Sequence, residues 1–62
     1  MQDQTIKEKL HSHILRLCRK QQLPGRYWLR EYQVIGFTYL CEIENIDTKI
    51  IETILVKHKD II

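Results

Sequence analysis

The first third of the chain repeats apolar residues at helical spacing. Steps of four and three place Ile6, Leu10, Ile14, Leu17 and Cys18 on one face of a helix. Thr5 followed by Glu8 fits a capping box, in which each side chain bonds a backbone N–H at the helix start. Pro24 and Gly25 are typical of the segment that follows a helix. The pattern predicts a helix over residues 5–22.

The last third has a similar pattern. Ile46, before a capping Asp47, and Ile51, four residues beyond it, fit a hydrophobic staple. The apolar stripe continues through Ile50, Ile51, Ile54 and Leu55. We expect a second helix over residues 48–59.

The middle of the chain, residues 26–46, fits two periods. An alternating pattern typical of a strand is formed by Ile35, Phe37, Tyr39, Cys41 and Ile43. At helical spacing, Trp28, Tyr32 and Ile35 also share a face, and Gly36 provides a break before Thr38 as a second N-cap. We favour two short helices, at about 26–35 and 38–45, over a strand.

These elements predict an all-α fold, a small bundle of three to four short helices in a single domain that spans residues 1–62. The alternative is an α+β domain with a strand at about 33–43 between two helices. The expected core consists of Ile6, Leu10, Ile14, Leu17, Leu23, Trp28, Leu29, Tyr32, Ile35, Phe37, Leu40, Ile43, Ile46, Ile50, Ile51, Ile54 and Leu55.

A few apolar residues fall outside the main stripes. We expect them to be exposed and to form an interface with a protein partner or with a second copy of the chain. They are Val34, Val56, Ile61 and Ile62.

Charge is unevenly distributed along the chain. Residues 1–31 have an excess of cations, whereas residues 32–62 have an excess of acids, and the whole chain is +2. A segment without any acid, residues 16–30, contains Arg16, Arg19, Lys20, Arg26, Tyr27 and Arg30. A turn at Pro24-Gly25 would bring these cations together, which indicates contact with nucleic-acid phosphates, with Tyr27 stacking or hydrogen-bonding. A conventional reading helix is disfavoured, because Glu42 and Glu44 would repel phosphate.

Catalytic and metal-binding patterns have little support. Ser12 is the only serine, and His11 and His13 would point in different directions on a helix. Cys18 and Cys41 form no C-x-x-C pair, so we expect two free thiols and neither a metal site nor a cofactor. We therefore expect no enzymatic activity.

No apolar run has the roughly 20 residues that a membrane-spanning helix needs, and no signal peptide is visible, so we expect a cytoplasmic protein. Taken together, the patterns predict a small non-catalytic regulator that contacts nucleic acid, DNA or RNA, through residues 16–30. The alternative is a protein-binding adaptor or inhibitor that uses exposed apolar helix surface.

Overall fold

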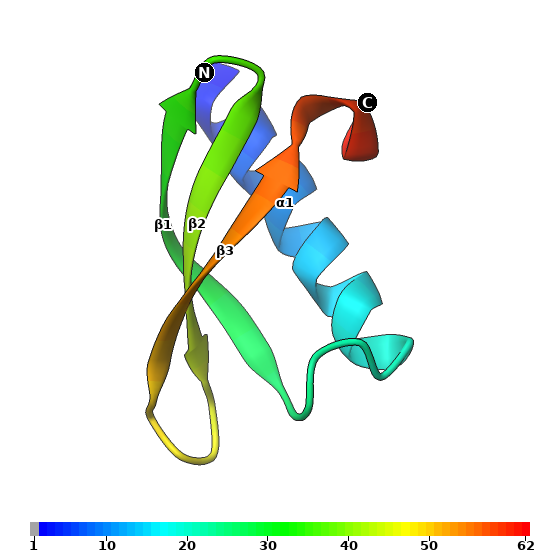
Figure 1. Cartoon of the computed structure of the whole chain (residues 1–62), viewed down its shortest axis with the longest axis vertical. Helices are drawn as coiled ribbons and strands as arrows, with labels where there is room; N and C mark the ends of the chain where they lie inside the picture. Colours follow the sequence, from blue (N-terminus) through cyan, green and yellow to red (C-terminus); the bar gives the residue numbers. More distant parts are fainter. Residues whose placement is uncertain (1) are drawn as a thin grey trace.

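A computed structural model describes residues 2–62 of the chain, with side chains from Thr5 onward. One helix, α1 (Gln2–Arg19), precedes three strands, β1 (Tyr27–Ile35), β2 (Thr38–Asn45) and β3 (Ile51–Lys57). A short 3-10 turn, η1 (His58–Asp60), follows β3. The strands form one antiparallel sheet in the order β1-β2-β3 (Figure 1).

The prediction of an all-α bundle is therefore wrong, because the described chain is an α+β domain with one helix and a three-stranded sheet. The helices expected at about 26–35, 38–45 and 48–59 are strands for most of their length. The alternative had the α+β class, but its single strand at about 33–43 crosses the turn between β1 and β2, and no helix follows it in residues 46–57.

The β1–β2 hairpin turns at Gly36 and Phe37. Ile35 pairs with Thr38, so Gly36 and Phe37 form the whole loop. Gly36 has a φ of 62°, a left-handed conformation that glycine adopts without steric cost. A glycine at the first position of a two-residue loop is typical of hairpins whose turn follows the twist of the strands. Gly36 thus joins two strands and does not separate two helices.

Helix α1 confirms the first predicted element, although its bounds differ. Thr5 lies inside the helix and so does not cap it, and the helix ends at Arg19, five residues before the proline. Gln21 has a φ of 61°, and the amides of Gln21 and Gln22 donate to the carbonyl oxygens of Cys18 and Leu17. This pair of bonds is a Schellman motif, which satisfies the last carbonyls of the helix.

A polar loop, and not a helix N-cap, connects β2 to β3. The buried Asn45 accepts hydrogen bonds at its side-chain oxygen from the amides of Asp47 and Thr48, at 2.8 and 3.0 Å. Lys49 adopts a φ of 66°, and its amide donates to the Asn45 carbonyl. These bonds reverse the chain, so that the β-branched residues from Ile51 onward continue as an edge strand.

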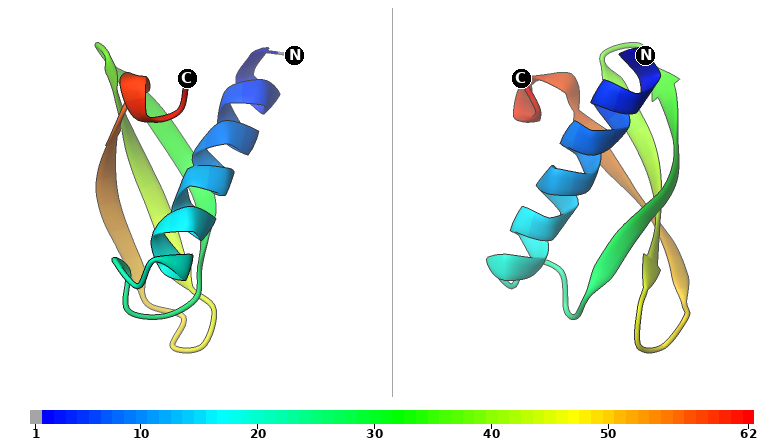
Figure 2. Two further views of the ribbon diagram at one scale, coloured as in Figure 1. Left: turned by 90° about the vertical axis from the view of Figure 1, so that its right-hand side faces the viewer. Right: turned by 180° about the vertical axis from the view of Figure 1, so that it is seen from behind.

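The core lies between α1 and one face of the sheet (Figure 2). Buried side chains alternate along β2, as expected for a strand with one covered face. The buried apolar residues are Leu10, Ile14, Tyr27, Leu29, Tyr39, Cys41, Ile43 and Val56. Seven residues expected in the core are instead exposed: Trp28, Ile35, Phe37, Ile46, Ile50, Ile51 and Leu55. Phe37, Ile46 and Ile50 lie in the connections between strands, and the other four lie on the sheet face opposite α1.

Candidate nucleic-acid interface

Four basic side chains lie along one flank of α1. Lys9, His13, Arg16 and Lys20 are separated by steps of four, three and four, so they fall within an arc of about 60° around the helix axis. We call these four residues the basic stripe. Its centre is about 90° around the helix axis from the buried Leu10. The basic stripe therefore follows the side of the helix and does not face the core.

The cations of the basic stripe, and Arg19 beside them, are free of ion pairs. Lys9, Arg16, Arg19 and Lys20 are exposed, and no salt bridge among the described side chains of residues 5–62 includes any of them. Residues 9–25 contain these four cations and no acid, whereas residues 26–57 contain four cations and five acids. The uncompensated positive charge of the molecule is thus concentrated on α1.

Two cations of the predicted segment lie elsewhere, with acidic partners. Arg26 forms an ion pair with Asp47 across the ends of two loops, and this hydrogen bond holds the pKa of the Asp47 carboxyl below its usual range. Arg30 lies 3.6 Å from both Glu42 and Glu44 on neighbouring strand β2. The structure therefore does not bring the five predicted cations together, because local acids neutralise two of them.

Arg30 is placed by an irregularity in β1. The register shifts between Leu29 and Glu31, so Arg30 is the additional residue of a β-bulge. Leu29 is buried beneath α1. Arg30 instead contacts Glu42 and Glu44, which are half-buried and alternate along β2 with the core residues. Arg30 thus belongs to the sheet face opposite α1.

Tyr27 lies in the core. Its ring is 3% exposed, and its hydroxyl donates to a carboxylate oxygen of Glu52 at 2.9 Å. A base cannot stack on a ring that is covered in this way, so the predicted contact of Tyr27 with nucleic acid has no surface to use.

The four residues expected at a partner interface do not form one surface. Val56 is 2% exposed, so the expectation that it is a surface residue is wrong, and Ile61 packs against the core. Val34 and Ile62 are exposed. Val34 of β1 and Val56 of β3 pair with Tyr39 from either side, and of the two only Val34 is exposed to solvent.

A larger apolar surface was missed by the analysis of the sequence. No element of the described chain covers the sheet face opposite α1 (Figure 2). Side chains alternate between the two faces along each strand, so the neighbours of the buried residues lie on this open face. Its apolar residues include Trp28, Leu40, Ile51 and Leu55, and all of these except the half-buried Leu40 are exposed. The alternating pattern of β2 was the signal that could have identified it.

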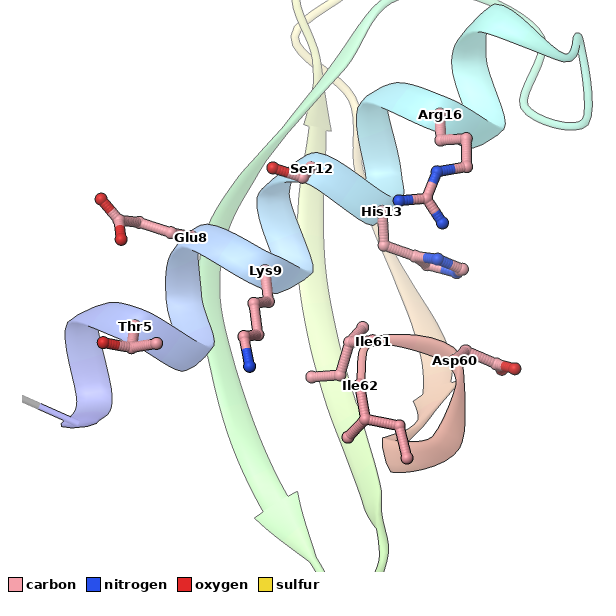
Figure 3. A pocket seen from close by; sticks show the side chains of 9 residues that line it. All are labelled: Thr5, Glu8, Lys9, Ser12, His13, Arg16, Asp60, Ile61 and Ile62. Carbon is pink, nitrogen blue, oxygen red and sulfur yellow. The ribbon is translucent and has the colours of Figure 1, made fainter.

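The basic stripe borders a hollow between α1 and the C-terminal turn (Figure 3). The hollow measures about 300 Å³ and is lined by Thr5, Glu8, Lys9, Ser12, His13, Arg16, Asp60, Ile61 and Ile62. Tyr39 holds η1 in place, because its hydroxyl lies 2.8 Å from Nδ1 of His58. The His58 amide also donates to the carbonyl of Phe37 at 2.9 Å. The wall opposite α1 is thus anchored to the sheet.

Other chemistry is sparse in the described residues. Among the side chains of residues 5–62, no three His, Cys, Asp or Glu lie close enough to share a metal ion. Cys18 and Cys41 are both free thiols, and burial raises the pKa of the Cys41 thiol to about 11. The one helix of this part of the chain is too polar to cross a bilayer.

Comparison with protein-family models, with curated proteins and with solved structures finds no match for this chain.

Proposed function

We propose that this protein is a small non-catalytic regulator that binds nucleic acid through the basic stripe and Arg19 of α1. The observation that carries the proposal is the set of four exposed cations on α1 and the turn directly after it, without any acidic partner among the described side chains. Unpaired Arg and Lys side chains can form charge-assisted hydrogen bonds with phosphate oxygens and neutralise the phosphates of a nucleic-acid strand. The proposed surface replaces the predicted segment 16–30, of which only Arg16, Arg19 and Lys20 remain available.

The length of the surface suits a strand of backbone phosphates. Lys9 and Lys20 lie about 16 Å apart along the helix axis. The phosphates of one strand follow each other at about 3.4 Å along the axis of a duplex, so the surface is long enough to face several of them. Three or four phosphate contacts would give weak binding, with Kd in the range of about 1 to 100 μM. The same number of contacts predicts that affinity falls about 40- to 150-fold when salt increases from about 50 to about 200 mM.

The test is fluorescence anisotropy with a labelled duplex and a labelled single strand at both salt concentrations. Arg16→Gln/Lys20→Gln removes two cations of the basic stripe, and Lys49→Gln/Lys57→Gln removes two exposed cations from the β2–β3 loop and from β3, so the two variants have equal net charge. We expect the α1 variant to lose most binding and to have a salt slope shallower by about two. The sheet variant should stay close to the wild type. Equal effects of the two variants would mean that only net charge matters and would contradict the proposal.

A second candidate function, binding of a protein, is favoured by the open sheet face. Trp28, Ile51 and Leu55 are exposed there around the ion pairs of Arg30. Packing of two such faces would cover these apolar side chains, so a second copy of this chain is the partner to test first. Sedimentation equilibrium of the wild type and of Leu55→Asp tests this. A dimer that the substitution dissociates supports the candidate, and a wild-type monomer at about 100 μM contradicts it.

A further inference from the structure

We infer that the hollow between α1 and the C-terminal turn is a phosphate-binding site centred on His13. The inference rests on the proposed function, since it assigns one phosphate contact of the basic stripe to a defined place. The ligand is a tetrahedral phosphate group, either within a nucleic-acid strand or free in solution. The site consists of the His13 imidazole, with Lys9 and Arg16 one helical turn to either side.

The first observation is a buried nitrogen that lacks a partner. Nδ1 of His13 is buried and has no hydrogen-bond partner among the side chains described from Thr5 to Ile62. A buried polar atom without a partner is costly, so such an atom beside a hollow indicates a ligand that completes its hydrogen bonding. A half-turn of the ring about its Cβ–Cγ bond brings Nδ1 toward the hollow, and in the tautomer that carries its proton on this nitrogen the ring can then donate to a phosphate oxygen.

The second observation is the arrangement of the charges around this nitrogen. In Figure 3 the amino group of Lys9 and the guanidinium of Arg16 extend on the same side of α1 as the His13 ring, which faces the C-terminal turn. Two acids also line the hollow, but the carboxylates of Glu8 and Asp60 point away from it. The charge directed into the hollow is therefore positive, as an anion requires.

The third observation is the apolar wall. Ile61 and Ile62 lie opposite the helix, and Ile61 packs against the core. An apolar wall lowers the local dielectric and strengthens the attraction between a phosphate and the cations beside it. A hollow of about 300 Å³ is also large enough for a phosphate group.

His11 supplies a matched control on the same helix. Like His13 it is half-buried, but it lines a different hollow with Lys7 and Leu29 on the other flank of α1. Since both substitutions replace an imidazole by an amide, His13→Gln and His11→Gln are equal in composition and differ only in position.

The experiment has two parts. In the first, affinity for a labelled duplex at about 50 mM salt is measured for His13→Gln and His11→Gln. We expect a loss of about fivefold for His13→Gln, the effect of one hydrogen bond, and less than twofold for His11→Gln. Equal affinities for the two variants, with duplex binding still lost in Arg16→Gln/Lys20→Gln, would overturn the site and leave the proposed function intact.

The second part uses the unmodified protein, so it does not depend on the folding of a variant. Imidazole resonances of His11 and His13 are followed by NMR during titration with the duplex and, separately, with inorganic phosphate against potassium chloride of equal ionic strength. A saturable change confined to His13 supports the site, and the titrant that produces it identifies the source of the phosphate. Equal changes at both histidines, or none with either titrant, would overturn the inference.

Discussion

Two adjacent residues of β3 provide a sharp test of the fold. Val56 is 2% exposed and lies beside Tyr39 on the core face, whereas Leu55 is 67% exposed on the open face. The helical interpretation assigned them the other way round, with Leu55 in the core and Val56 on the surface. Substitution of each by alanine therefore distinguishes the two arrangements. The sheet predicts the larger loss of unfolding free energy for Val56→Ala, and the helical interpretation predicts the larger loss for Leu55→Ala.

The expected magnitudes follow from burial. Val56→Ala removes two fully buried methyl groups, which costs about 1.6 kcal/mol at about 0.8 kcal/mol each, and the cavity raises the total to about 2–3 kcal/mol. Leu55→Ala removes three carbons that are only about one-third buried, so it costs about 0.8 kcal/mol and leaves no cavity. The whole domain should have a free energy of unfolding of about 3–9 kcal/mol, so Val56→Ala removes a large fraction of it.

The assay is urea denaturation of the wild type and both variants, followed by circular dichroism and by the fluorescence of the partly exposed Trp28. We expect the loss of free energy of unfolding for Val56→Ala to be at least twice that for Leu55→Ala, with unchanged slopes. Equal losses, or a larger loss for Leu55→Ala, would refute the assignment of the two faces of the sheet.

Four further predictions concern a helix end, a loop and the two cysteines. Gln21→Gly should stabilise the protein by about 0.5–1 kcal/mol, because glycine adopts the left-handed φ of this position without strain. The control Gln22→Gly should not stabilise it, and thermal unfolding compares the two variants. Asn45→Ala should destabilise by about 1–3 kcal/mol, since two loop amides lose their acceptor, and unchanged urea unfolding would contradict this. Iodoacetamide at pH 8 should modify the half-buried Cys18 well before Cys41, whose pKa of about 11 leaves almost no thiolate; mass mapping measures the order, and equal rates would refute it. Because the folded-state pKa of Cys41 is raised from 9.0 to about 11, stability should also decline as pH rises across this window in wild type and less in Cys41→Ala.

The first helix could be predicted from the sequence because its apolar residues fit only one period. A strand would place Glu8 and Ser12 on the same face as Ile6, Leu10 and Ile14, and would place Leu17 on the opposite face, whereas a helix separates the polar residues from the apolar ones. Its end could not be located, because the Schellman motif depends on Gln21 in a left-handed conformation, where glycine is the usual signal.

The strands were mistaken for helices because their apolar residues occupy both faces of the sheet. In β3, Ile51 and Leu55 lie on the open face while Ile54 and Val56 lie on the core face, and together they reproduce helical spacing. The β-branched residues of this segment were the better signal, since they fit a pleated sheet more readily than a helix.

The candidate site could be predicted only in part. Unpaired cations at Arg16, Arg19 and Lys20 follow from the absence of acids in this segment. The pairing of Arg26 with Asp47 depends on contacts between residues 21 positions apart, which a one-dimensional charge count does not contain. The same is true of the hollow, whose second wall comes from the other end of the chain.

The central claim, that α1 presents the nucleic-acid surface, is tested most directly by backbone amide NMR during titration with a short duplex at about 50 mM salt. The account predicts that the largest shift changes fall on residues 9–20, with smaller changes at the C-terminal turn and little change at Trp28, Leu40 and Leu55 of the open sheet face. Changes centred on the open face, or none at millimolar duplex, would contradict it.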